Sequence, residues 1–249
     1  MGPAKAATLP PCAGEVEIAR AKIVRVEKNG ALILDDGRAV LLEGIRLPLA
    51  DRGSPALADD ALRMLRTLAM TAPLQLAAMA PKQDRYDRVR VQAFGTAQSS
   101  NPIWLQTQLL RQGMARVAIA PDRNECAADF YRAELEARQG AKGLWAFPAF
   151  ALRRAGAVPL SDAGSFQVVE GRVTAAAIRD GRVLLDFSAD SRRGFAAVIA
   201  SEDRRAFRNV TPGPEALTGH TVRLRGMVED YGGRPQIAIS NPAQIEFIQ

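Results

Sequence analysis

Two stretches decide how this chain is expected to fold: VLLEGIRLPL at residues 40–49 and DRYDR at residues 84–88. Residues 39–45 are mostly apolar, have the length of a strand and predict a β-strand. The charged DRYDR stretch lies between two further strand-like segments, residues 74–78 and 89–94, and is therefore a turn. These patterns indicate a β-rich domain.

The region before residue 40 extends this domain as a meander of strands. Residues 18–26 are strand-like, and Asn29-Gly30 supplies a tight turn because both residues tolerate positive φ. Residues 31–34 lead to a second turn at residues 35–38, and the chain returns as the strand at residues 39–45. Three consecutive strands of this kind are expected for the first half of an OB barrel.

Three helices are expected among the strands of this domain. The first begins near Ser54-Pro55, a good N-cap followed by a residue suited to the first helical position, and its apolar period continues to residue 69. The second covers residues 103–112 and ends at Gly113. The third covers residues 125–139 and ends at Gly140.

The two opening stretches resemble the secreted staphylococcal nuclease (thermonuclease) family, whose pattern is V-R-L-x-G-I-D-x-P-E followed by D-R-Y-G-R. Further matches at residues 105–117 and 134–145 follow in the family's order, so the resemblance covers residues 16–148. The positions that agree with the pattern are Val40, Leu42, Gly44, Ile45, Pro48, Asp84, Arg85, Tyr86 and Arg88.

The residues that carry the family's chemistry are different here. Leu41 stands where the family has an arginine, Arg46 where it has a metal-binding aspartate, and Leu49 where it has the catalytic glutamate. The family's first metal carboxylates fall in the turn at residues 28–31, which has none. Calcium needs several oxygen ligands, so the resemblance implies a nuclease fold without its usual metal-dependent mechanism, and we expect no cofactor.

Four residues of this region are candidates for contact with phosphate or nucleic acid: Arg46, Arg85, Tyr86 and Arg88. Arg88 alone matches a catalytic arginine of the family, and one arginine can bind a phosphate but cannot generate a nucleophile. The alternatives are structural: Arg88 pairs with a neighbouring aspartate of its turn, and Tyr86 packs as a lid over the barrel.

Glu43 is the candidate for a displaced catalytic carboxylate, because it lies two residues beyond Leu41 and shares its face of the strand. The competing interpretation is an ion-paired or solvated strand glutamate.

After a linker at residues 149–164 the helical pattern disappears. Strand-like segments at residues 166–173, 183–187, 195–199, 221–228 and 236–239, with a short helix at 202–207, predict a second domain at residues 165–249. Residues 217–226 resemble a strand of nucleic-acid-binding OB modules. Arg223 and Arg225 share one face of that strand, which indicates either a groove for a nucleic-acid backbone or a solvated basic face. The expected fold class is thus β-rich α+β: a nuclease-like OB barrel with three helices at residues 16–148, and a second, smaller OB-like barrel.

Composition allows one large or two small domains and favours an acidic partner. The chain has 249 residues, a formal net charge of +6 and 47% hydrophobic residues. A basic protein favours polyanions such as nucleic acid. Its apolar runs are shorter than the roughly 18 residues of a membrane span. Residues 1–15 are expected to be a flexible lead-in of an exported chain whose signal peptide has been removed, which predicts a periplasmic or secreted protein.

The chain has two cysteines, Cys12 and Cys126, and neither has a metal-ligand spacing. We expect a disulfide that ties the lead-in to the third helix; two buried free thiols are the alternative.

Three functions follow from these observations. The first is binding of single-stranded nucleic acid or another polyanion without efficient metal-dependent cleavage. The second is a calcium-dependent phosphodiesterase that uses a relocated carboxylate. The third is a protein-interaction module of the cell envelope. Salt-sensitive oligonucleotide binding and calcium-dependent cleavage discriminate among them.

Overall fold

The structure is a computed structural model that describes residues 9–49, 55–80, 82–83, 88–95, 102–121, 123, 126–190 and 193–248. Its contacts divide the chain into two compact units. The first unit consists of Met1–Val117 and Glu125–Ala146, and the second of Ala118–Asn124 and Phe147–Gln249. In the described part, no helix is both long and apolar enough to cross a membrane.

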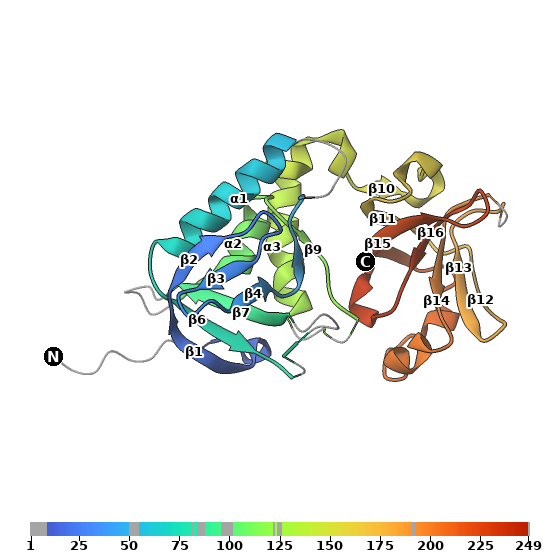
Figure 1. Ribbon diagram of the computed structural model, residues 1–249. Helices are drawn as coiled ribbons and strands as arrows, with labels where there is room; N and C mark the ends of the chain where they lie inside the picture. Colours follow the sequence, from blue (N-terminus) through green and yellow to red (C-terminus); the bar gives the residue numbers. More distant parts are fainter. Residues whose placement is uncertain are drawn as a thin grey trace. The chain divides into compact units, whose positions relative to one another are not determined.

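The strands of the first unit form one large curved sheet and one small pair (Figure 1). The large sheet has the order β1-β6-β7-β4-β3-β2, with β8 added beside β7, and β5 pairs with β9. The bounds are β1 Glu15–Ala21, β2 Ile23–Val26, β3 Leu32–Leu34, β4 Ala39–Leu42, β5 Ile45–Arg46, β6 Leu74–Ala78, β7 Val89–Gly95, β8 Ile103–Trp104 and β9 Arg116–Val117.

The strand expected at residues 18–26 is divided at Lys22, where the chain changes its partner. β1 pairs with β6, whereas β2 pairs with β3. The two ends of the sheet order are therefore consecutive in sequence. β4 and β7 are parallel, and the other neighbours in this order are antiparallel.

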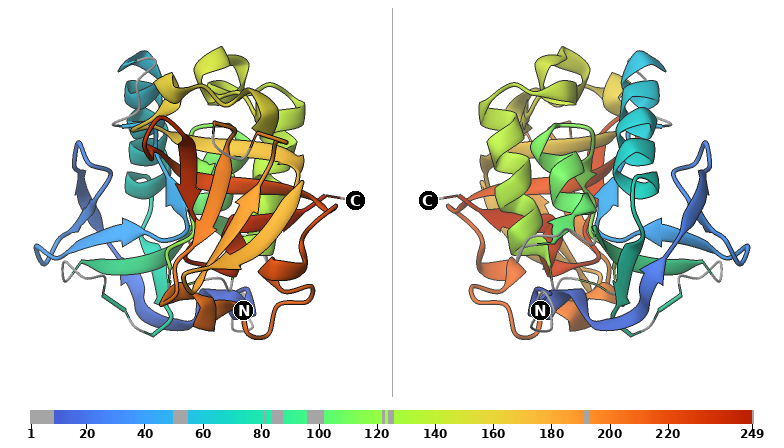
Figure 2. Two further views of the ribbon diagram at one scale, coloured as in Figure 1. Left: turned by 90° about the vertical axis from the view of Figure 1, so that its right-hand side faces the viewer. Right: turned by 90° about the vertical axis from the view of Figure 1, so that its left-hand side faces the viewer.

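The three expected helices are present: α1 Pro55–Met70, α2 Leu105–Arg111 and α3 Ala127–Gln139. The right-hand view of Figure 2 shows them side by side, with α2 between the other two. α1 buries one apolar stripe made of Leu57, Ala61, Leu62, Leu65 and Ala69. α2 begins two residues later than expected because Ile103 and Trp104 pair with β7.

The second unit contains a sheet of order β10-β11-β15-β16-β14-β13-β12, with β17 beside β15. Its bounds are β10 Arg153–Arg154, β11 Phe166–Arg172, β12 Ala175–Arg179, β13 Arg182–Asp186, β14 Ala196–Ile199, β15 Thr221–Asp230, β16 Pro235–Ala238 and β17 Ile245–Phe247. The left-hand view of Figure 2 shows this sheet from the front. β11 and β12 are again one strand that changes partner, and β14 and β16 are parallel. We call five strands of each unit its principal strands: β1–β2, β3, β4, β6 and β7 in the first, and β11–β12, β13, β14, β15 and β16 in the second. The two units have these strands in the same order.

Short 3-10 helices make several connections of the chain. The expected short helix at residues 202–207 is one of them, η6 Asp203–Phe207. The others are η1 Pro11–Ala13, η2 Gly143–Ala146, η3 Pro148–Phe150, η4 Ala155–Ala157, η5 Leu160–Asp162, η7 Pro214–Ala216 and η8 Pro242–Gln244.

Residues 149–164, which we expected to form a linker, belong to the second unit. Ala155 and Val158 lie in its hydrophobic core with the side chains of its strands. Pairing of β10 with β11 fixes this segment to the sheet. This pairing could not be predicted from the glycine and proline residues of the segment, which indicate only turns.

The segment Ala118–Asn124 is also part of the second unit, although it connects β9 to α3 of the first. The buried side chain of Asn241 holds it. The Asn241 amide nitrogen donates to the carbonyls of Ala120, Pro121 and Arg123 at 3.1, 2.9 and 2.7 Å. The second unit is therefore built from two separate stretches of sequence.

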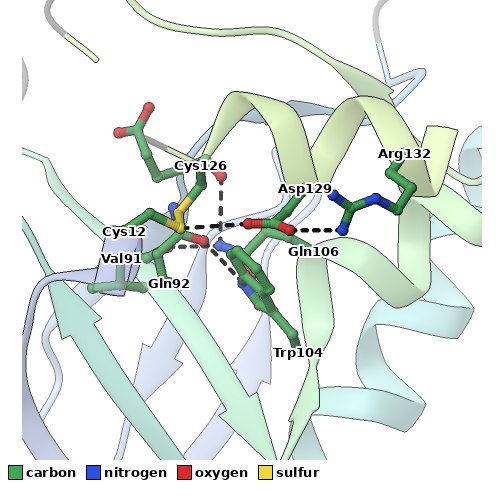
Figure 3. Close-up of a disulfide and its surroundings, with 9 residues drawn as sticks. Cys12, Val91, Gln92, Trp104, Gln106, Cys126, Asp129 and Arg132 are labelled. Carbon is green, nitrogen blue, oxygen red and sulfur yellow. Dashed lines mark hydrogen bonds and ion pairs between the residues drawn. A yellow bond between two sulfur atoms is a disulfide. The ribbon is translucent and has the colours of Figure 1, made fainter. Parts of the chain in front are cut away.

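The expected disulfide is confirmed. Cys12 in η1 and Cys126 at the start of α3 are bonded, with their Cα atoms 5.2 Å apart. Figure 3 shows the bridge beside the start of α3, with the Asp129 carboxylate 3.9 Å from the Cys12 sulfur. A disulfide sulfur carries no hydrogen, so this contact is not a hydrogen bond. The alternative of two free thiols was wrong.

Candidate nucleic-acid interface

The turn between β2 and β3 packs against two leucines. Its backbone is closed by hydrogen bonds from the Glu27 amide to the Ala31 carbonyl and from the Ala31 amide to Asn29 Oδ1, at 2.8 and 3.0 Å. Gly30 has a φ of 84°. A Cβ atom at Gly30 would lie 2.9 Å from Leu47 Cδ1 and 3.5 Å from Leu49 Cδ1, so aliphatic methyl groups fill this side of the turn.

Glu43 faces a basic side chain of the neighbouring strand. Its Oε2 lies 3.1 Å from Arg90 Nε, and each side chain is only 11% exposed. The amide of Gly44 donates to the other carboxylate oxygen at 3.1 Å. Residue 43 follows β4, and the parallel pairing of β4 with β7 sets Leu41 beside Arg90. The carboxylate is therefore oriented by Arg90 on one side and by the Gly44 amide on the other.

Of the four phosphate-contact candidates, the structure describes two. Arg88 is exposed and directly precedes β7, on the same strand face as Arg90 two residues on. Arg46 is half-buried on β5, opposite Arg116 of β9. Arg85 and Tyr86 lie outside the described residues.

The base of the loop that carries Arg88 is fixed by contacts on both sides. The Arg90 amide donates to the Lys82 carbonyl at 2.9 Å, and the Lys82 ammonium lies 2.7 Å from Glu17 Oε1 of β1. The hydrogen bond to Glu17 raises the pKa of Lys82, which therefore stays charged and paired. Arg88 is exposed at the end of this loop.

Buried polar side chains hold the strands behind this site. The Gln106 amide of α2 bridges the backbone of β7: Nε2 donates to the Val91 carbonyl at 2.9 Å, and Oε1 accepts from the Ala93 amide at 3.2 Å. Glu134 of α3 accepts the Val117 amide of β9 at 2.7 Å. These bonds fix β7 and β9, and with them the positions of Arg88 and Arg46.

A comparison with protein families covers the part of this arrangement that lies beyond the Gly30 turn. Residues 39–147 match the family model described as Staphylococcal nuclease homologue. The chain therefore contains a staphylococcal nuclease-like domain. The comparison with curated proteins found no match.

In the described part of the nuclease-like domain, the position expected for calcium has no cluster of carboxylate ligands. Leu47 and Leu49 place methyl groups against the Gly30 turn, and the neighbouring Arg46 is a cation. Among the described residues, no group of three or more His, Cys, Asp or Glu side chains is placed to hold a metal ion. Because calcium requires several oxygen ligands, these residues do not fit it.

Arg223 and Arg225 of the second unit, expected to line either a groove for a nucleic-acid backbone or a solvated basic face, are buried. Arg223 binds Glu170 of β11 and Glu246 of β17, each at 2.6 Å, and Arg225 binds Glu246 at 3.0 Å. The two arginine side chains are 9% and 1% exposed. Cross-strand register places each glutamate beside an arginine, so the charges are neutralised inside the sheet.

Arg90 is the site residue that the sequence reasoning missed. Arg90 is two residues from Arg88, and alternate residues of a strand share a face, so the sequence could have predicted that the two arginines lie on the same side. Its pairing with Glu43 had no local signal, because the two residues lie on strands joined by a long crossover.

Proposed function

We propose that this chain binds single-stranded nucleic acid or another polyanion through its nuclease-like domain, and that it does not cleave the ligand through a bound calcium ion. The observation that carries this proposal is that Arg46 and Leu49 stand where the family has carboxylates, with Leu49 packed against the Gly30 turn, while the exposed Arg88 remains. Removing metal ligands abolishes the means of activating water, but an arginine still binds phosphate oxygens.

We also infer that each unit is a small OB-like barrel, which supports this location for the interface. Both units share one strand order, with the third and fifth principal strands parallel. OB folds bind oligonucleotides with the loop between the first two strands and the loop between the last two. In the nuclease-like domain these are residues 27–31 and 79–88, which hold the Gly30 turn and Arg88.

The disulfide supports the inference that the chain works outside the cytoplasm, in the periplasm or after secretion. Structural disulfides persist in oxidising compartments and are rare in the reducing cytosol.

The structure disfavours Glu43 as a relocated catalytic base. Arg90 contacts one carboxylate oxygen of the 11% exposed Glu43 side chain, and the Gly44 amide donates to the other. A general base must instead lie within hydrogen-bond reach of the attacking water.

The test is a fluorescence-polarisation titration of labelled single-stranded DNA, at low and moderate salt and with calcium or chelator, followed by a gel of the same samples. We expect salt-sensitive binding and intact DNA. Arg88→Ala should weaken binding about three- to tenfold and reduce the log–log salt slope by about one. Arg66→Ala, which removes an exposed arginine on α1, is the matched control and should change affinity less than about twofold.

Two outcomes would contradict the proposal. Calcium-dependent fragments that disappear in Glu43→Gln would establish the phosphodiesterase with a relocated carboxylate. Absence of binding at low salt, with no cleavage, would favour the protein-interaction module of the cell envelope.

A further inference from the structure

The connection between β14 and β15 of the second unit encloses a pocket of about 530 Å³. Its walls come from η6 and from the turn that leads into η7. Among the lining residues are Arg204, Arg205, Arg208, Phe207, Val210 and Glu215. A volume of this size lies in the range of small-molecule sites, roughly 300–1,000 Å³.

The walls of this pocket are anchored in the hydrophobic core. Phe207, at the end of η6, is 4% exposed, and Leu217, just after η7, is 1% exposed; both belong to the core of the second unit. The Val210 amide donates to the Phe207 carbonyl at 3.1 Å, and the Ala216 amide donates to the Gly213 carbonyl at 2.9 Å. The pocket is thus formed before any ligand arrives.

The three arginines of the pocket form no ion pair with a described residue. Arg205 and Arg208 are exposed and form no ion pair with any described residue, and Arg204 donates only to the Gly181 carbonyl, at 3.3 Å. In a 3-10 helix, residues three apart are eclipsed, so Arg205 and Arg208 project from the same side. Two like charges on the same side of a short helical segment repel each other, and an anion bound between them would relieve the repulsion.

The nearby carboxylates do not neutralise these arginines. Glu202 accepts a hydrogen bond from the Ser201 hydroxyl at 3.0 Å. Burial, and then the charge of Glu202, raise the pKa of Asp203, and no arginine acts on it in the opposite direction. Glu215 lines the pocket without an ion pair to a described residue.

We propose that this pocket binds the phosphate group of a small phosphorylated molecule. Guanidinium groups match phosphate oxygens with paired, charge-assisted hydrogen bonds. The Glu215 carboxylate can accept a hydrogen bond from a hydroxyl group of the same ligand, such as a sugar hydroxyl. The pocket lies in the connection between the third and fourth principal strands, away from the loops with which OB folds bind oligonucleotides, which favours a small ligand over a strand of nucleic acid.

The experiment uses the full chain and two double variants. Arg205→Ala with Arg208→Ala removes two pocket charges. Arg179→Ala with Arg193→Ala removes the same charge from exposed positions of the second unit that do not line the pocket. Each protein is titrated by calorimetry with inorganic phosphate, AMP, adenosine and a single-stranded oligonucleotide, and its thermal unfolding is followed with and without phosphate.

We expect saturable binding of phosphate or AMP to the unsubstituted chain and none of adenosine. The pocket variant should bind at least about tenfold more weakly, and the control variant within about twofold. Phosphate should raise the unfolding temperature of the unsubstituted chain and of the control, but not of the pocket variant.

Three results would overturn the proposal: no saturable binding of either phosphate compound, equal weakening in both double variants, or a pocket variant that loses only oligonucleotide binding. The last would make the pocket a nucleic-acid surface. The two proposals fail separately, because the pocket variant keeps Arg88 and should therefore retain its salt-sensitive oligonucleotide binding.

Discussion

The ion pair between Glu43 and Arg90 favours a structural role for Glu43 over a catalytic one. Glu43 was the single carboxylate available as a relocated base, and the structure places it 3.1 Å from Arg90 with both side chains 11% exposed. Its role is therefore to hold β7 beside β4. Neutralising one partner leaves the other charge in a poorly solvated place, which is destabilising.

A double-mutant cycle measures this role. Glu43→Gln should lower the free energy of unfolding of the first unit by about 2 kcal/mol, and the coupling with Arg90→Met should be about 1–2 kcal/mol in urea unfolding. Glu27→Gln breaks the exposed pair with Arg25 and should cost less than about 0.5 kcal/mol. Equal costs at residues 43 and 27 would show that the buried pair has no special role.

Asp203 should make the second unit more stable in acid. Burial and Glu202 raise the pKa of Asp203 in the folded chain, so the folded state binds its proton more tightly than the unfolded state does. Stability then falls as pH rises through the unfolded and the raised folded pKa. Asp203→Asn should raise the unfolding temperature at neutral pH, with a gain that disappears as pH falls below the carboxylate range. A gain that is independent of pH would contradict this explanation.

The strands β11, β15 and β17 are joined by a ladder of alternating charges. Glu170, Arg223, Glu246 and Arg225 follow one another across these three strands, and Arg154 adds an exposed contact to Glu170 at 3.4 Å. The ladder lets a sheet enclose two arginines, and it attaches β17, the last strand of the chain, to β15. Breaking the ladder at its shared glutamate affects both arginines at once.

Glu246→Gln should therefore lower the free energy of unfolding of the second unit by about 2–3 kcal/mol, a value reduced for the partial exposure of Glu246. Circular dichroism during urea unfolding measures the change. Glu229→Gln is the matched control, because Glu229 lies exposed on the same β15. It should change stability by less than about 0.5 kcal/mol. A similar cost for both variants would mean that the ladder contributes nothing.

Over the whole chain, the disulfide closes a loop that contains most of the nuclease-like domain. Cys12 and Cys126 are separated by 114 residues, so the bridge restricts the unfolded chain strongly. It also secures η1 and the start of β1 to α3. The strand ladder from β1 to β7 lies within this loop.

Replacing both cysteines with serine should lower the stability of the first unit by roughly 3–5 kcal/mol in the chain-entropy account. Thermal unfolding with and without reductant measures the effect. Reductant should destabilise the original chain to about the level of the variant and should leave the variant unchanged. A reductant effect on the double variant would point to a different cause.

Local pattern was sufficient for most elements of this protein. Periodicity and residue type predict the bounds of β6 and α1 and the meander around Gly30, because these patterns act between near neighbours in the chain. The absence of carboxylates at residues 28–31 is read directly from the sequence. β12 and β17 were missed. Ala175–Arg179 has small exposed residues rather than an alternating apolar pattern, and Ile245–Phe247 is defined by its pairing with β15.

The partners of the charged residues were decided by the tertiary structure alone. Register between strands far apart in sequence placed Arg90 beside Glu43 and Arg223 between Glu170 and Glu246, and it brought Arg225 to the same Glu246. The same packing made residues 149–164 part of a core and gathered Arg204, Arg205 and Arg208 around one pocket. Burial and ion pairing depend on distances between residues that are far apart in the sequence. Those distances cannot be derived from the residue types along the chain.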